Sequence, residues 1–317
     1  DDTEAVVRSA LGRLPGELVP VRFDGMGPTL TRLMGRGLRR FPHVTHGLLS
    51  DADFEPRSGL DKRTLQRTCS RATYHIMSDG GAESRLSDWV YRNVPGMRMH
   101  RRTHQTLFGS TIPAQRTYQC VTDLRVMEYT GGYQDRSGNK ARNYISWLEQ
   151  DLAEIPGDER SIYYLGHAHL VGSYGRGSNP GDQVRTNGVG RRHAFEALRY
   201  FLLRASIPTG ASEERYFAFG QAAEIYERWL WESDRAIDVW QRCADTDPLR
   251  ADCWFYIGQC YRLHGSPSRA LPTLERASDL AEPPRSFGHW DYLYSCLRHL
   301  ELARAVHQAA HCAAEGP

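Results

Sequence analysis

The segment 254–277 carries the feature that most constrains how this chain folds. Large and small residues alternate at helical spacing, first over 254–261 and again over 270–277, so each stretch presents one face to the other. The glycine and alanines let two antiparallel helices approach closely, and the larger residues fill the space between them. The pattern comprises Trp254, Ile257, Gly258, Tyr261, Ala270, Leu274 and Ala277. It predicts a hairpin of two packed helices.

This hairpin pattern resembles the tetratricopeptide consensus, W-x2-L-G-x2-Y followed by A-x3-F-x2-A. One weaker copy consists of Ala223, Tyr226, Ala236 and Trp240 and ends at Asp247-Pro248. Another consists of Leu165, Gly166, His169, Ala197 and Phe201, interrupted by a Gly-rich insertion at 172–191. A degenerate pair covers about 287–312. The repetition predicts a solenoid of helical hairpins, and the alternative is a helical bundle in which the spacing arises by chance.

The first part of the chain has a different pattern, in which short helical and strand-like stretches alternate. Helical patterns begin at Asp2 or Thr3 and again after the Gly25–Pro28 breaker. Strand-like runs stand at 18–23, 46–50, 72–77, 86–91 and 97–104, the last two joined by a turn at 93–96. This order is typical of an α/β domain. We therefore predict an α/β domain at 1–128, a polar Gly-rich linker at 129–141 and an all-α domain at 142–312.

Two carboxylates, Asp51 and Asp53, follow the apolar run at 46–50. Carboxylates spaced in this way at the exit of a strand can share Mg²⁺ or Mn²⁺, which keeps open positions for diphosphate oxygens. The metal would then stabilise the charge on a leaving nucleoside diphosphate. An isolated acidic pair is more often simply solvated. Here the preceding strand and the following Phe54-Glu55-Pro56 favour the metal site.

The surrounding motifs resemble those of an inverting family 2 glycosyltransferase of the GT-A fold, fused to tetratricopeptide repeats. In this family a D-A-D-x-E-like motif precedes a segment matched here by Arg85-Leu86, Arg92-Asn93, Gly96, Arg98 and His104. A downstream family segment is matched by Arg142-Asn143, Leu148-Glu149, Asp151-Leu152, Pro156, Asp158 and Arg160. The resemblance implies a partial, GT-A-like (Rossmann-like) domain. It also implies that the chain, which begins at Asp1, is truncated at its N-terminus.

The resemblance implies transfer of a sugar, with inversion, from a nucleotide-sugar donor such as a uridine diphosphate sugar to a hydroxyl of a glycan or protein acceptor. Asp51 and Asp53 would hold Mn²⁺ or Mg²⁺, with His104 as a third ligand. Arg92 would contribute to the donor site. Glu83 and Asp88 lie in the region of the general base that inversion requires, and Asp88 is the better candidate of the two.

Several departures from the family pattern favour a second hypothesis. Gln105 replaces the acid that follows the histidine in the family, and the family's opening strand is absent. Near the start of the second helix, where relatives often have a basic residue, Gly27-Pro28-Thr29-Leu30 has none before Arg32. The alternative is therefore a non-catalytic repeat scaffold that carries a degenerate transferase remnant and binds a protein partner on its repeats. Fold alone does not choose between the two hypotheses.

Composition narrows the class of protein further. The chain of 317 residues is 40% hydrophobic and 25% charged with a net charge of +2, which excludes global disorder and gives no indication of nucleic-acid binding. No apolar run is long enough to span a membrane, so a cytoplasmic location is expected. The seven cysteines include no CxxC pair, a count and spacing that favour reduced thiols over disulfides or a zinc site.

Overall fold

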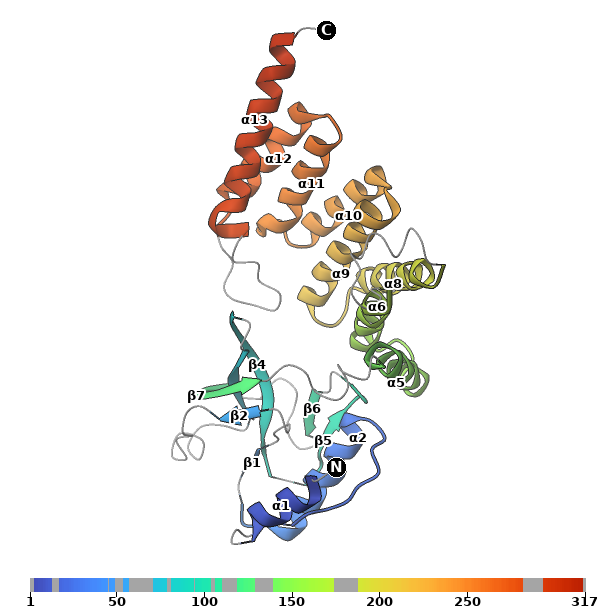
Figure 1. The fold of residues 1–317 in the computed structure, drawn as a ribbon, viewed down its shortest axis with the longest axis vertical. Coiled ribbons are helices and arrows are strands. Elements are labelled where there is room, and N and C mark those ends of the chain that lie inside the picture. The colour runs from blue at the N-terminus through green and yellow to red at the C-terminus, as the bar shows by residue number, and fades with distance from the viewer. Residues whose placement is uncertain are drawn as a thin grey trace. The chain divides into compact units, whose positions relative to one another are not determined.

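The computed structural model divides the chain into two compact units, residues 1–138 and 139–317 (Figure 1). The structure describes residues 3–12, 17–44, 46–48, 54–56, 71–78, 81–93, 95–103, 106–109, 119–128, 139–173, 188–281 and 293–315. The boundary between the units falls within the range 129–141 that the sequence predicts as a linker.

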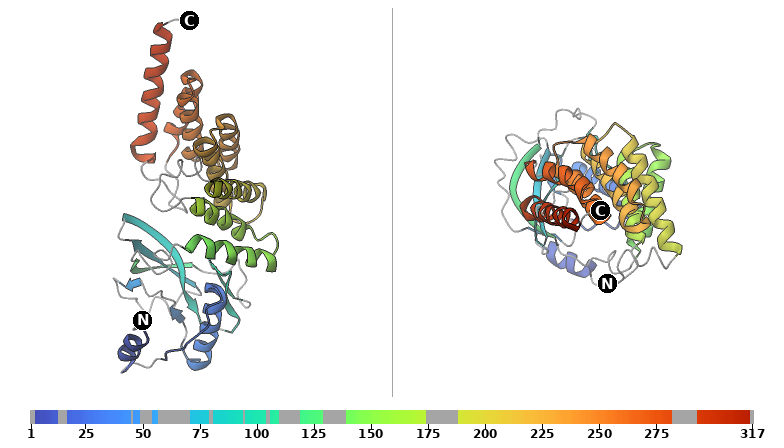
Figure 2. Two further views of the ribbon diagram at one scale, coloured as in Figure 1. Left: turned by 45° about the vertical axis from the view of Figure 1, so that its right-hand side comes forward. Right: turned by 90° about the horizontal axis from the view of Figure 1, so that it is seen from above.

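The described residues of the first unit form two helices and two sheets (Figures 1 and 2). The helices are α1 (Thr3–Leu11) and α2 (Met26–Arg40). A five-stranded sheet has the order β1-β4-β3-β7-β2, with β1 at His46–Leu48, β2 at Phe54–Pro56, β3 at Arg71–Ser78, β4 at Gly81–Arg92 and β7 at Gln119–Glu128. A second sheet pairs β5 (Met97–His100) with β6 (Thr106–Gly109).

The strand pairing corrects the predicted α/β organisation. Among the described strands, β3 and β7 are the one parallel pair, and the other neighbours run antiparallel. β1, which was expected to lead into the acidic pair as a buried strand, is an edge strand of the described sheet, paired with β4. β3 and β4 pair as a hairpin, with Ser78 opposite Gly81. A crossover helix is therefore not what joins these two strands.

Two further strand predictions are wrong. Residues 18–23 form no strand, and Val21 and Phe23 are exposed. Pro20 in this run lacks the N–H that a strand ladder needs. The turn at 93–96 does not make a hairpin of β4 with β5, because β5 pairs with β6. Instead, the Asn93 side-chain amide donates hydrogen bonds to the carbonyl oxygens of Phe41 and Val44.

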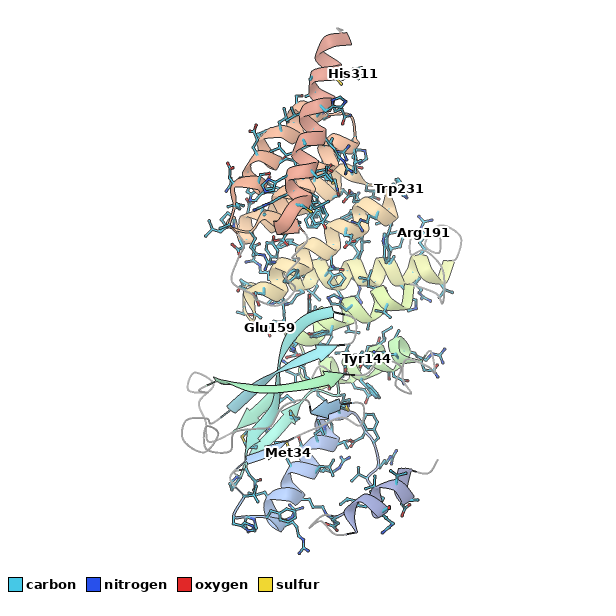
Figure 3. All side chains as sticks on the ribbon, turned by 60° about the vertical axis from the view of Figure 1, so that its left-hand side comes forward. Met34, Tyr144, Glu159, Arg191, Trp231 and His311 are labelled. Atoms are coloured by element: carbon cyan, nitrogen blue, oxygen red, sulfur yellow. A yellow bond between two sulfur atoms is a disulfide. The ribbon has the colours of Figure 1, made fainter. Side chains whose placement is uncertain are left out.

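The amphipathic pattern predicted for the second helix is confirmed in α2. Met34 of α2 packs on Met99 of β5, and both side chains are buried (Figure 3). The Thr31 hydroxyl accepts a hydrogen bond from the Met99 N–H at 2.8 Å and donates one to the Met99 carbonyl at 3.2 Å. Helix and strand are thus joined by apolar contact and by a side chain that satisfies edge backbone groups.

The second unit is built from helices that pack on their neighbours in sequence (Figures 1 and 2). They are α5 (Lys140–Glu154), α6 (Glu159–Ser173), α8 (Gly188–Ser206), α9 (Ser212–Glu224), η2 (Ile225–Leu230), α10 (Ser233–Thr246), α11 (Ala251–Leu263), α12 (Pro267–Asp279), η3 (Leu293–Leu297) and α13 (Arg298–Glu315). The helical-hairpin solenoid predicted from the repeats is confirmed. Part of the predicted last pair, at 287–292, lies outside the described residues.

One contact recurs in three hairpins and explains why they pack. A glycine on the first helix faces a large side chain on the second: Gly166 faces Phe201, Gly220 faces Trp240 and Gly258 faces Leu274. A Cβ atom added to these glycines would lie 2.7, 3.2 and 2.4 Å from the facing side chain. Real Cβ contacts are seldom so short, so only glycine lets the helices approach this closely.

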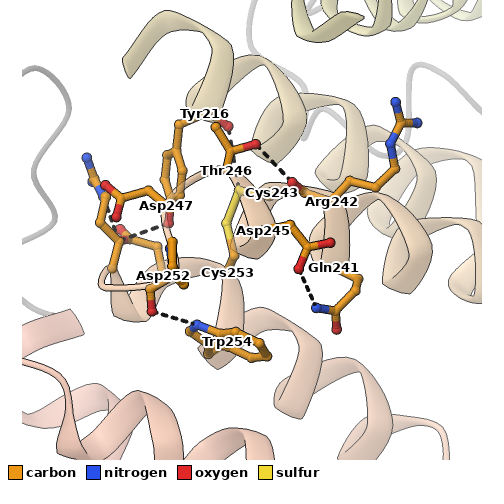
Figure 4. The surroundings of a disulfide bond; sticks show 12 residues. Tyr216, Gln241, Arg242, Cys243, Asp245, Thr246, Asp247, Asp252, Cys253 and Trp254 are labelled. Atoms are coloured by element: carbon orange, nitrogen blue, oxygen red, sulfur yellow. Dashed lines mark hydrogen bonds and ion pairs between the residues drawn. A yellow bond between two sulfur atoms is a disulfide. The ribbon is translucent and has the colours of Figure 1, made fainter. Parts of the chain in front are cut away.

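A disulfide corrects the prediction that the cysteines are reduced. Cys243, near the end of α10, is bonded to Cys253 in the first turn of α11 (Figure 4). The short connection between these helices brings the two Cα atoms within 6.0 Å, a separation that suits a disulfide. Cys260, also on α11, is a buried free thiol, and burial raises its pKa.

Candidate functional site

The residues predicted to form a metal site are not tested by the structure. Asp51, Asp53 and His104 lie outside the described residues, so the predicted Mn²⁺ or Mg²⁺ ligands stay a prediction. Asp88 and Arg92 belong to β4, where the Arg92 backbone lies opposite His46. Within the described parts of the chain, no group of three His, Cys, Asp or Glu side chains is placed to hold a metal ion.

A small cleft in the helical unit is a candidate site. It lies between α9 and α11, with one residue of α10 in its wall. Its lining residues are Tyr216, Phe217, Gly220, Gln221, Glu224, Trp240, Asp252 and Tyr256. The five residues from α9 recur every three to four positions, which places them on one helix face. The sequence analysis identified Trp240 as a repeat residue and did not identify the cleft.

Aromatic packing shapes the cleft. Trp240 stacks on Tyr256 with ring centroids 4.6 Å apart and an angle of 13° between the rings. Both rings are almost wholly buried, so they stabilise the junction of α10 with α11 as well as lining the cleft. Gly220 contributes no side chain, so the Trp240 ring reaches the α9 backbone. The same glycine that packs the hairpin therefore lets the Trp240 ring form part of the cleft wall.

Charged side chains in and behind the cleft are paired. Asp252 accepts hydrogen bonds from the Tyr216 hydroxyl at 3.3 Å and from Arg250 Nε at 3.2 Å. The Arg250 guanidinium in turn lies over the rings of Tyr216, at 4.5 Å, and Phe217, at 4.9 Å. Because ion pairing and cation–π contact stabilise this buried arginine, it holds α9 against the start of α11.

Glu224 lies at the open side of the network. Its carboxylate is 2.8 Å from Arg228 one turn further along, and burial raises its pKa. Gln221 precedes it by three residues and is half-buried. The cleft therefore combines aromatic faces with one amide, Gln221, and two carboxylates, Glu224 and Asp252.

A second buried network fixes the hairpin that precedes the cleft. Arg204 of α8 is fully buried and donates hydrogen bonds to the carbonyl oxygens of Ile207 and Ala211. Its Nε lies 3.7 Å from Glu214 of α9, and Arg160 of α6 lies 2.5 Å from the same carboxylate. One carboxylate thus joins three helices. Arg204 stands at a repeat position that is usually small, which is why the repeat pattern gave no indication of this network.

No family model matches the chain, and no curated protein matches it. The chain is similar to solved structures of tetratricopeptide-repeat proteins. The crystal structure of the MamA protein is 14% identical, covers 56% of this chain and 78% of that chain, and has a TM-score of 0.37. YrrB, a TPR protein with an unusual peptide-binding site, is 14% identical, covers 55% of this chain and 81% of YrrB, and has a TM-score of 0.33.

PcrH in complex with the chaperone binding region of PopB is 12% identical to this chain, covers 48% of it and 95% of PcrH, and has a TM-score of 0.30. These likenesses are distant. The assignment of a helical repeat therefore rests on the chain's own hairpins and on their three glycine contacts.

The predicted glycosyltransferase is corrected by these findings. The similar structures are repeat proteins, and none of the three is a glycosyltransferase. The described sheet is mostly antiparallel and does not have the predicted α/β form. Nothing supports a GT-A domain or a nucleotide-sugar donor. In the part of the chain that the structure describes, no helix is long and apolar enough to cross a membrane.

Proposed function

We propose that this chain is a protein-binding repeat scaffold whose cleft between α9 and α11 binds a segment of a partner protein. The observation that carries the proposal is the cleft itself, in which aromatic rings, an amide and two carboxylates converge from successive hairpins. Aromatic residues bury a large area and keep few conformations, so they are common where proteins recognise one another.

The cleft also indicates what the partner segment offers. The half-buried ring of Phe217 suits contact with an apolar or aromatic side chain, and Gln221 can both donate to and accept from a peptide group. Glu224 suits a donor such as an amide or hydroxyl better than a strong cation, because Arg228 already neutralises its charge. We therefore propose a short peptide segment with an apolar anchor next to a hydrogen-bond donor.

Selection of peptides on the full chain tests this proposal. Peptides that bind the immobilised chain are enriched from a displayed random-peptide library. The enriched peptides are then synthesised, and their dissociation constants for the chain are measured. Gln221→Trp adds bulk at the cleft without removing a described packing contact, and we expect it to weaken binding by about tenfold or more. Gln241→Trp is the matched control, because Gln241 is exposed on α10, outside the cleft lining.

Two outcomes would contradict the proposal. Selected peptides that bind both tryptophan variants as tightly as the unmodified chain would place the binding surface elsewhere. Failure to enrich any peptide over a background with no protein would exclude short-segment recognition. The melting temperature of each variant shows whether the fold is kept.

A further inference from the structure

Two histidines meet in the hairpin of α6 and α8. His169 of α6 is 8% exposed, and its Nδ1 lies 2.9 Å from Nδ1 of His193 on α8. The ring centroids are 5.2 Å apart. The two nitrogens therefore lie close to the line between the centroids, and each ring directs the same type of atom at the other. This arrangement suits a hydrogen bond between the two Nδ1 atoms. A metal ion would need the lone pairs of both nitrogens to point at the position of the ion instead of at each other.

The contact holds only in certain protonation states. A neutral imidazole carries one N–H and one acceptor nitrogen, so one histidine must donate from Nδ1 and the other must accept there. When both rings are protonated, each presents an N–H to the other, and the hydrogen bond is replaced by repulsion between two cations. The two titrations are therefore coupled. The contact is complete only while one of the two Nδ1 atoms carries a proton and the other does not.

The surroundings oppose protonation. Burial lowers the pKa of His169 to about 4, with a further lowering by His193, and burial also lowers the pKa of His193. The charged groups of the described residues that act on the pair are Arg192, Glu196 and Arg199, all on α8. Glu196 favours the charged imidazole but is itself paired with Arg199 at 2.8 Å. In the described residues, neither α5 nor α9 adds a charge that shifts either pKa.

The site has little room to rearrange. Tyr200 of α8 stacks on the His169 ring, with centroids 5.6 Å apart and an angle of 15° between the rings. A Cβ on Gly172 would lie 3.3 Å from the His193 ring, so that ring is tightly packed against the α6 backbone. His167, nearby on α6, faces Tyr163 and Phe201 instead of the pair. A change of charge at the pair therefore cannot be absorbed by a small side-chain movement.

Different interactions stabilise the two ends of the α6–α8 hairpin. The end that holds the start of α6 and the end of α8 is fixed by Arg204, Glu214 and Arg160. Arginine keeps its charge at all relevant pH values, so the charges of Arg204 and Arg160 do not change in this range. His167, on α6 against Tyr163 and Phe201, is a further buried histidine of this hairpin, and burial lowers its pKa to about 4. The opposite end, where α6 finishes and α8 begins, is joined by His169 and His193.

We propose that the His169–His193 pair is an acid-sensitive latch that holds the end of α6 to the start of α8 and releases it when the pH falls. The direction of the pH dependence follows from which state binds protons more readily. The unfolded or opened state takes up protons near the ordinary histidine pKa of about 6.5, whereas the closed state resists them. The latch is fully effective above that pH, and its contribution is lost progressively as the pH falls toward 4. The expected result is local opening of this hairpin end, with α11 and α12 unaffected.

Hydrogen exchange of the full chain at about pH 7.5 and pH 5, corrected for intrinsic exchange rates, tests the latch. We expect opening of 166–173 and 188–196 to increase about tenfold or more at the lower pH, while 251–279 does not change. His193→Gln removes one titrating group and should abolish most of this increase. His264→Gln is the matched control, because His264 bonds to Ser233 in a different hairpin, and it should leave the increase intact.

A second measurement keeps the proposal testable if the His193→Gln variant fails to fold. Histidine ring signals of the unmodified chain can be followed by nuclear magnetic resonance during an acid titration. Two pKa values near the ordinary 6.5 for His169 and His193 would overturn the proposal. An unchanged exchange rate in both hairpin segments at the lower pH would also overturn it, as would an equal increase in His193→Gln.

Discussion

The helical unit and the strand-containing unit differ in how far apart in sequence their contacts lie. In the helical unit each helix packs on its neighbour, and one glycine contact recurs in successive hairpins at Gly166, Gly220 and Gly258. In the sheet, β1 pairs with β4, and β2 pairs with β7, across long stretches of intervening chain. The spacing of residues within each hairpin therefore determines the fold of the helical unit. The fold of the sheet depends on strands that are far apart in sequence, and a local sequence pattern does not identify which strands pair.

The largest expected effect comes from the buried charges of the helical unit. Arg204→Met leaves Glu214 buried beside Arg160 alone, and we expect it to lower the free energy of unfolding by about 3–5 kcal/mol. Arg199→Met, on the exposed face of the same helix, should change it by less than about 0.5 kcal/mol. Urea titration followed by far-UV circular dichroism measures both. Equal effects would show that the buried network does not join the repeats.

Opening the disulfide should have the next largest effect. The loop that it closes is short, with a sequence separation of 10, and chain entropy gives a contribution of about 2–3 kcal/mol. We expect Cys243→Ala combined with Cys253→Ala to lower the urea midpoint of the helical unit accordingly. Cys312→Ala, at an exposed cysteine of α13, is the control. A midpoint that the double variant leaves unchanged would contradict a stabilising cross-link between α10 and α11.

The recurring glycine contact gives a smaller and more local prediction. In Gly258→Ala the new methyl group would meet the Leu274 side chain, and we expect a loss of about 1–3 kcal/mol. At Gly188, at the start of α8, a Cβ would meet nothing within 4 Å, so Gly188→Ala should be neutral or slightly stabilising. Should both substitutions cost the same, close helix approach would not be the reason for the glycine.

The smallest expected effect lies in the strand-containing unit. Thr31→Val keeps the shape of the side chain but removes both hydrogen bonds to Met99, and we expect a loss of about 1 kcal/mol. Hydrogen exchange of 26–40 and 97–100 in the full chain should increase, with no change over 139–281. If exchange increased over the helical unit as well, the two units would not be energetically separate.

The sequence predicts those elements whose partners are close by. The α11–α12 hairpin follows from its own spacing, and so does the face of α2 that carries Met34. The run at 18–23 has the composition of a strand. A strand also needs a neighbouring strand whose backbone N–H and C=O groups are free to pair with it, and composition does not show whether one is present. A usable signal was overlooked at Asp79-Gly80, a dipeptide typical of tight hairpins, which stands between β3 and β4.

The candidate cleft was less predictable than the fold. The repeat pattern indicates that Trp240 packs in a hairpin, but the cleft forms only where α9, α10 and α11 meet in space. Asp51 and Asp53 were predicted from their spacing after an apolar run, and His104 from its likeness to a family motif; all three lie outside the described residues and stay a prediction. The disulfide had no signal either, since a ten-residue separation is not a recognised cysteine spacing.

A hydrogen-exchange footprint of the full chain with a selected peptide tests the central claim most directly. The claim is that the cleft between α9 and α11 binds a partner segment. We predict that saturating peptide slows exchange over 216–224 and 252–256 and leaves α8 and the strand-containing unit unchanged. Protection confined to residues 1–138, or to the outer face of α8, would contradict the claim.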